Sequence, residues 1–281
     1  MWATMASVVK MILNEIPNFE ALCVSSALAF VFLLAVNIAT GKIRKIKECT
    51  PGMLAKMAGL GFIGLFLYGA LYYEGLDRLS SQEACITNYV WPIMLVIFSV
   101  IILKEKMTKL KAGAMICSFI GIVVLCSGET AAEGGGRLAG IACCIIGAAM
   151  YGLFSVLNKK ADLDQNITMM VIWLTVAVCA GLTGALTDTW VQIHGAEWIG
   201  MIWLGVVVNA LAYLLWALAL KGSENTAFIA NRAYLTPFLS ILISAVLLNE
   251  KISLRAAAAL VFIVGGILVQ SIAEQSGRPA E

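Results

Sequence analysis

The chain has 281 residues, of which 61% are hydrophobic and only 13% are charged, with a net charge of +2 and a mean hydropathy of +0.92. Soluble domains are about half apolar and a quarter charged, so this composition excludes an ordinary water-soluble protein. The small positive charge does not indicate nucleic-acid binding, because the basic residues cluster beside long apolar runs, where they set orientation in a membrane.

The apolar residues fall into ten runs separated by polar turns. Most runs are about 20 residues long, which suffices for a helix to cross a hydrocarbon core of roughly 30 Å. Barrel strands would be about ten residues long and would alternate in polarity. The sequence therefore predicts an all-α integral membrane protein with ten transmembrane helices. In chain order the runs are 1–13, 19–39, 54–77, 81–103, 107–127, 138–158, 167–187, 198–221, 225–248 and 252–273.

The first run is too short to span, since 13 residues reach only about 20 Å. It is not a signal peptide, because it lacks a basic start and a small-residue cleavage site. By comparison with the second half of the chain, we expect a truncated first helix that would normally begin roughly a dozen residues before Met1. A natural helix of half length is the less favoured alternative.

Orientation follows from the basic residues in alternate loops. Thirteen lysines and arginines fall on one side and five on the other. The positive-inside rule therefore predicts a multi-pass protein of the inner membrane with both termini in the cytoplasm.

An internal repeat appears when the second half is shifted by 145 positions. Two five-helix repeats are predicted, at 1–128 and 137–274. Because five is odd, the second repeat enters the membrane from the opposite face, an inverted arrangement typical of secondary transporters. The matches are Tyr68 with Tyr213, Tyr89 with Tyr234, Pro92 with Pro237, Ser99 with Ser244, Glu105-Lys106 with Glu250-Lys251, and Gly121 with Gly266.

This pattern resembles the drug/metabolite transporter superfamily in its ten-helix EamA-type branch. The resemblance covers essentially the whole chain and is carried by a Tyr-x-x-Pro helix followed by an apolar run that ends in Glu-Lys, in both halves. The segment from Met1 to Met5 resembles the family's first-helix Trp motif. The segment from Asn88 to Pro92 resembles the aromatic amino-acid exporters, although the branch also exports other metabolites.

Amphipathic side chains gather at similar depths inside the predicted spans. Aromatic walls with a few polar groups suit an organic solute, so we expect a binding cavity here; helix packing and interfacial anchoring are the alternatives for any single ring. Trp216 belongs to the same group of side chains. The candidate substrate-binding residues are Trp2, Tyr68, Tyr72, Asn88, Tyr89, Trp91, Tyr151, Asn209, Tyr213, Asn231, Arg232 and Tyr234.

Arg232 and the two mid-span prolines each allow a functional and a structural interpretation. Arg232 lies about seven residues into its span, and a charge there is expensive unless it faces a cavity or a partner. It would bind a substrate carboxylate, or alternatively extend outward to the membrane surface or pair structurally with Glu83 or Glu224. Pro92 and Pro237 break helical hydrogen bonds at matching depths, which predicts a pair of hinges, with packing kinks as the alternative.

No Asp or Glu lies at the middle of a span, so proton coupling is not established; Glu74 is the best candidate for it. Glu105 and Glu250 are interpreted as structural helix-end residues. The eight cysteines and the single histidine form no catalytic or metal-binding motif, and the sequence contains no P-loop motif. We therefore predict no catalytic site, no metal and no cofactor.

We therefore predict a secondary transporter, not an enzyme, that exports small organic metabolites, with amino acids preferred, by alternating access. Efflux of hydrophobic drugs or organic cations is the alternative. The expected partners are a small-molecule solute and the lipid bilayer, without nucleic acid. The exact substrate, the direction, the coupling and the oligomeric state stay open.

Overall fold

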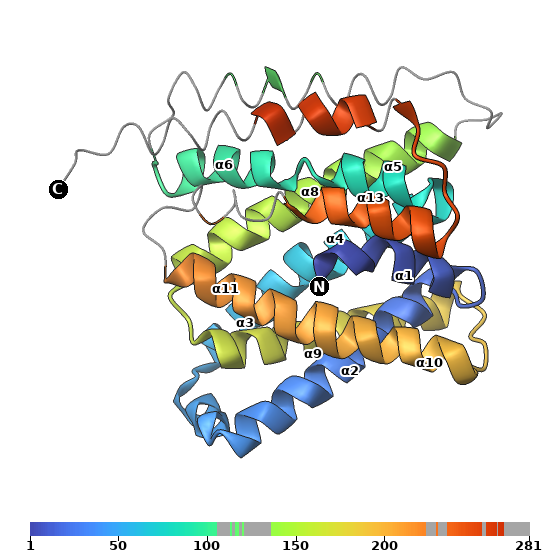
Figure 1. The fold of residues 1–281 in the computed structure, drawn as a ribbon. Helices are drawn as coiled ribbons and strands as arrows, with labels where there is room; N and C mark the ends of the chain where they lie inside the picture. Colours follow the sequence, from blue (N-terminus) through green and yellow to red (C-terminus); the bar gives the residue numbers. More distant parts are fainter. Residues whose placement is uncertain are drawn as a thin grey trace.

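The computed structural model describes residues 1–105, 136–222, 235–254, 257–262 and 264–266, with isolated positions at 113, 116, 117, 120 and 229. The described residues form helices and no strands. The helices lie side by side in one bundle, with α2 at one edge and the N-terminus near the centre (Figure 1).

The helical elements, in chain order, are η1 (Trp2–Thr4), α1 (Met5–Leu13), α2 (Asn18–Ala39), η2 (Lys42–Glu48), α3 (Pro51–Leu60), η3 (Gly61–Phe66), α4 (Leu67–Arg78), α5 (Ser81–Asn88), α6 (Trp91–Ile102), α8 (Gly136–Ala161), α9 (Gln165–Thr187), α10 (Gly195–Ile202), η4 (Trp203–Ala212), α11 (Tyr213–Lys221) and α13 (Leu235–Leu247).

Six spans are long and apolar enough to cross a membrane: Asn18–Ala39, Pro51–Arg78, Ser81–Ile102, Gly136–Ala161, Gln165–Thr187 and Glu197–Lys221. Trp2–Leu13, α13 and Ala257–Gly266 are shorter apolar helices at three more of the predicted positions. The run at 107–127 lies largely outside the described residues. The all-α membrane fold is confirmed, and the described helices fit the predicted arrangement of ten.

Turn chemistry sets where the long spans begin. The Thr50 hydroxyl accepts a hydrogen bond from the backbone N–H of Met53, and the Ser80 hydroxyl accepts one from the N–H of Glu83. Asp164 does the same for two N–H groups at the start of α9. Such N-caps satisfy donors that the first helical turn leaves free.

Two spans contain a π-helical segment at matching places in the two repeats. In the third span η3 lies between α3 and α4, and in the eighth η4 lies between α10 and α11. Shifted by 145 positions, η3 falls within η4, and each segment ends shortly before its matched tyrosine, Tyr68 or Tyr213. Extra residues in a helical turn rotate the face that follows, and such segments are frequent at functional sites.

Polar contacts join the repeats at both ends of the bundle. At one end, the Glu20 end, the Glu20 carboxylate accepts the N–H of Val191 at 2.9 Å, and Asp188 accepts the N–H of Phe19 at 3.0 Å. At the opposite end, the Lys45 end, Lys45 donates to Asp164 at 2.6 Å. Between the ends, α2 packs extensively against α9, and α8 packs against α4 and α6.

Candidate functional site

The fourth span is interrupted where the sequence places Pro92. Helix α5 ends at Asn88 and α6 begins at Trp91, so Tyr89 and Val90 form the junction. Proline has no N–H group, so the carbonyl of Asn88 lacks its usual partner four residues on. The break directs Asn88, Tyr89 and Trp91 toward the middle of the bundle.

These residues line a small cavity of about 40 Å³. This volume is close to the space of one water molecule, whereas small-molecule sites usually have 300 Å³ or more. The side chains have therefore closed on one another in this conformation. The lining consists of Trp2, Met5, Tyr68, Asn88, Tyr89, Trp91, Tyr151, Tyr213 and Thr236.

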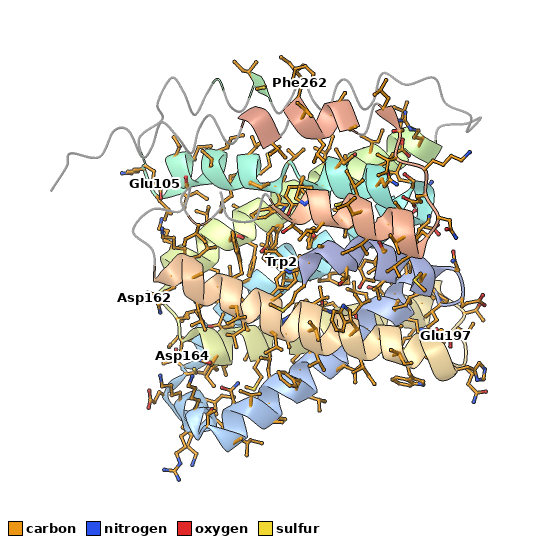
Figure 2. All side chains as sticks on the ribbon, viewed as in Figure 1. Trp2, Glu105, Asp162, Asp164, Glu197 and Phe262 are labelled. Atoms are coloured by element: carbon orange, nitrogen blue, oxygen red, sulfur yellow. The ribbon has the colours of Figure 1, made fainter. Side chains whose placement is uncertain are left out.

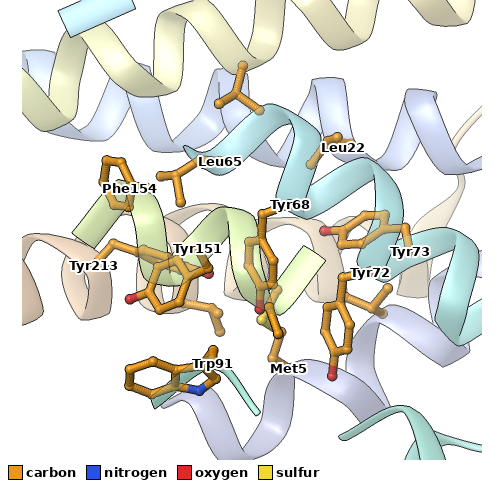
Figure 3. Close-up of a cluster of buried hydrophobic side chains, with 14 of the residues drawn as sticks. Met5, Leu22, Leu65, Tyr68, Tyr72, Tyr73, Trp91, Tyr151, Phe154 and Tyr213 are labelled. Atoms are coloured by element: carbon orange, nitrogen blue, oxygen red, sulfur yellow. The ribbon is translucent and has the colours of Figure 1, made fainter. Parts of the chain in front are cut away.

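Trp2 is the central ring of this cluster and lies near the middle of the bundle (Figure 2). Its ring centroid is 5.3 Å from those of Tyr213 and Trp216 and 6.3–6.4 Å from those of Trp91 and Tyr151, all in edge-to-face arrangements. Each such pair contributes about 0.5–1.5 kcal/mol beyond area burial. Figure 3 shows Tyr68, Tyr151, Tyr213 and Trp91 gathered in one cluster, with Tyr151 in contact with the other three.

Polar groups from both halves of the chain meet within the cluster. The Asn88 side-chain amide donates to the Tyr68 hydroxyl at 3.1 Å. The side chain of Tyr213 lies close enough to that of Tyr68 for the two to interact. These two tyrosines are repeat equivalents, so the inverted repeats meet at the site itself.

Several buried polar atoms beside the cavity have no hydrogen-bond partner among the described residues. They include the indole N–H groups of Trp2, Trp173 and Trp216, the amide nitrogen of Asn209 and the amide oxygen of Asn88. Each buried polar group without a partner costs about 1–3 kcal/mol. Unpartnered donors and an acceptor around one aromatic cluster are what a polar solute would satisfy.

The structure brings together seven of the twelve candidate binding residues at the cavity: Trp2, Tyr68, Asn88, Tyr89, Trp91, Tyr151 and Tyr213. Tyr72 instead stacks on Tyr68 with ring centroids 5.7 Å apart, and Asn209 is buried at 2% exposure without lining the cavity. Asn231, Arg232 and Tyr234 lie outside the described residues, as does Glu224. Pro237 is buried within α13.

Three residues near the site were not predicted. Trp173 contacts Tyr213 with ring centroids 5.4 Å apart, and its position in the middle of an apolar run was an available signal. Met5 and Thr236 line the cavity because they lie one turn after Trp2 and beside Pro237. Neither residue type distinguishes a lining position from ordinary packing.

Charged side chains lie toward the ends of the bundle, and none lines the cavity within the described part of the chain. Glu74 pairs with Arg78 and accepts a hydrogen bond from Asn18 beside an open depression of about 450 Å³ at the Glu20 end. Glu83 pairs with Arg137 at 2.8 Å.

A second space of about 350 Å³ adjoins the cavity between η1, α11 and the start of α13. Trp2 and Thr236 line both spaces, so they form the wall between them. The other lining residues shown here are mainly apolar: Met1, Ala212, Leu215, Trp216, Ala219 and Ile229.

Comparison with known protein families shows to which family this chain belongs. The sequence profile of the EamA-like transporter family matches residues 1–127 and 138–272. The chain belongs to the EamA-like transporter family. Its relatives carry small solutes across membranes, which fits a cavity lined by aromatic rings inside a helical bundle.

Individual EamA-like relatives are distant but cover almost the whole chain. It is 25% identical to the aromatic amino acid exporter YddG of Ancylobacter novellus, over 97% of this chain and 93% of that protein. It is 27% identical to the uncharacterized transporter YvbV of Bacillus subtilis, over 88% and 81% of the two chains. A solved crystal structure with 21% identity superposes with a TM-score of 0.77 over 99% of this chain and 95% of that one, which supports the fold.

Proposed function

We propose that this EamA-like transporter is a secondary carrier that exports small organic metabolites, with amino acids as the preferred class, across the inner membrane by alternating access. The observation that supports it best is the cavity between the repeats, where aromatic rings and unpartnered polar atoms meet around the Tyr68–Tyr213 pair. The proposed orientation puts the Lys45 end and both termini in the cytoplasm.

The chemistry of the cavity supports an amphipathic solute. Indole N–H donors such as those of Trp2 and Trp216 would bind a carboxylate, and the Asn88 oxygen would accept from an ammonium group. Aromatic faces also attract a cation directly. Arg232 is proposed as the charged partner of the carboxylate, on the sequence argument alone.

The names of the relatives bear on the solute. YddG of Ancylobacter novellus is named an aromatic amino acid exporter, and a YddG of Salmonella typhimurium is 24% identical over 63% of this chain. Stacking on Trp91, Tyr151 and Tyr213 would favour a ring-bearing solute. At 24–25% identity, these names make aromatic amino acids the first solutes to test.

The experiment is counterflow of radiolabelled amino acids in proteoliposomes. Saturable flux of one amino-acid class that Trp91→Ala abolishes would support the proposal, with Trp198→Ala as control because Trp198 is exposed on α10. Flux of quaternary ammonium dyes without amino-acid flux would select the alternative of drug or cation efflux. No saturable flux of any solute would contradict the carrier function.

A further inference from the structure

Glu250, which the sequence analysis interprets as a structural helix-end residue, lies between the cavity and the Glu20 end of the bundle. Glu250 follows α13, and its carboxylate reaches the start of α5 in the other repeat. One oxygen accepts the backbone N–H of Ser81 at 2.7 Å, and the other accepts that of Gln82 at 3.1 Å. The Gln82 side chain returns a bond to the Glu250 carbonyl at 3.3 Å.

These are charge-assisted hydrogen bonds at a helix N-terminus. The first N–H groups of a helix have no partner within it, and they carry the positive end of its dipole. Glu250 is partly buried there and serves as the cap of a helix from the opposite repeat. Bonds to a charged group are stronger than those between neutral groups, so this contact holds the two repeats together.

A line of small polar residues continues from this contact toward the cavity. The Ser81 and Ser244 hydroxyls are 2.9 Å apart, and Ser7 of α1 is also 2.9 Å from Ser244. One turn further along α5, Cys85 lies beside Ser240, which is one turn earlier on α13. All five side chains are buried: Ser7, Ser81, Cys85, Ser240 and Ser244.

The same pairing of turns on α5 and α13 continues to the cavity. Another turn along each helix brings Tyr89 and Thr236, which both line the cavity. Helices α5 and α13 therefore form an antiparallel seam that runs from Glu250 at the end of the bundle to the aromatic cavity. A solute can reach the cavity along this seam only if α5 separates from α13.

We propose that Glu250 is the gating residue of this end of the pathway: its carboxylate locks the start of α5 onto α13, and release of that contact opens the cavity to the Glu20 end. The proposal rests on the proposed transport function. The repeat places Glu105 at the matching position, where it accepts a hydrogen bond from Ser99 at 3.1 Å. Ser99 and Ser244 are themselves repeat equivalents, so the gate is built from matched elements.

The buried thiol of Cys85 reports on the seam without any need for flux. With the other seven cysteines replaced by serine, a hydrophilic maleimide is added to the protein in lipid nanodiscs. Glu250→Gln is expected to raise the labelling rate of Cys85 roughly tenfold, because it removes a charge-assisted contact. Ser244→Ala, which leaves the charge in place, is expected to raise it as well.

Glu74→Gln is the matched control, because Glu74 lies at the same end but is bonded within its own repeat to Arg78 and Asn18. It should leave Cys85 labelling unchanged. Equal labelling in wild type, Glu250→Gln and Ser244→Ala, with each variant monodisperse and folded, would overturn the proposal.

A cross-link tests the gate in the opposite sense. In a cysteine-free chain, Ser81→Cys with Ser244→Cys should form a disulfide that stops flux, and a reductant should restore it. Continued flux with the disulfide fully formed would contradict gating at this seam. If the wild-type chain carries no solute, the transport function fails, while Cys85 labelling still decides whether Glu250 holds the seam shut.

Discussion

The side chains of Tyr68 and Tyr213 lie close enough to interact, although 145 positions separate the two residues. Each belongs to the same place in its own repeat, just after a π-helical segment. Equivalent residues of inverted repeats meet only near the axis that relates the repeats. The pair therefore marks the centre of the molecule, and the cavity is built around it.

The two hydroxyls should contribute unequally to stability. The Tyr68 hydroxyl accepts a hydrogen bond from the Asn88 side-chain amide, so Tyr68→Phe leaves a buried donor without its partner, whereas Tyr213→Phe leaves this bond in place. We expect Tyr68→Phe to lower the free energy of unfolding by about 1–3 kcal/mol and Tyr213→Phe by less. Thermal unfolding in detergent, followed by a thiol-reactive dye, measures both. Equal losses would contradict a stabilising role for the bond between Asn88 and Tyr68.

Asn209 should behave in the opposite way, because its buried amide nitrogen has no partner among the described residues. Asn209→Leu keeps the size and removes the unpartnered group, so we expect stability to be retained or raised while flux falls. Asn37→Leu is the matched control. Its amide donates to the carbonyls of Leu33 and Asn166, so the same substitution should destabilise the fold. A loss of stability in Asn209→Leu equal to that in Asn37→Leu would refute a binding role.

Gly205 allows η4 to approach α2 closely. A Cβ atom at this position would lie 2.6 Å from the Cβ of Leu28 and 2.7 Å from the carbonyl oxygen of Ser25. Since backbone has to move, Gly205→Ala should cost about 1–3 kcal/mol of unfolding free energy. Gly59→Ala, where the Cβ meets open space, should be neutral or stabilising. Similar unfolding temperatures for the two variants would show that η4 adapts freely.

The sequence predicted the helical fold, the ends of most spans and the gathering of mid-span aromatic residues. The break at Pro92 lies where its missing N–H requires it. The π-helical segments could not be predicted, because an apolar run in lipid fits either helical register. The reach of Glu250 across the repeats was missed for a related reason: a carboxylate near a helix end looks the same whether it meets water or the amides of a distant helix.

The contact between Lys45 and Asp164 at the Lys45 end should make stability depend on pH. Burial by itself raises the pKa of Asp164, but hydrogen bonds from Lys45, Ile167 and Asn166 outweigh it and hold the pKa below the ordinary value of 3.8. A carboxylate with a lowered pKa stabilises the fold above its unfolded pKa, and the contribution is lost as pH falls below about 3.8. Unfolding temperatures measured from pH 6 to pH 3 should fall less steeply for Asp164→Asn than for wild type. Lys45→Ala should make this loss smaller, because the pKa of Asp164 in the folded state then lies closer to its unfolded value. Parallel profiles for all three proteins would exclude the contact as a source of pH dependence.

Arg232 offers the sharpest test of the solute's chemistry, since it is the strong charge placed far inside a predicted span. If it binds a carboxylate, Arg232→Ala should abolish amino-acid flux, and Arg232→Lys should restore little because lysine lacks the planar fork. Esterified amino acids, which lack the carboxylate, should be carried equally by wild type and Arg232→Ala. Arg78→Ala is the control, because Arg78 pairs with Glu74 at the Glu20 end. Full amino-acid flux in Arg232→Ala would make Arg232 structural and would leave the neutral indole donors as the carboxylate's partners.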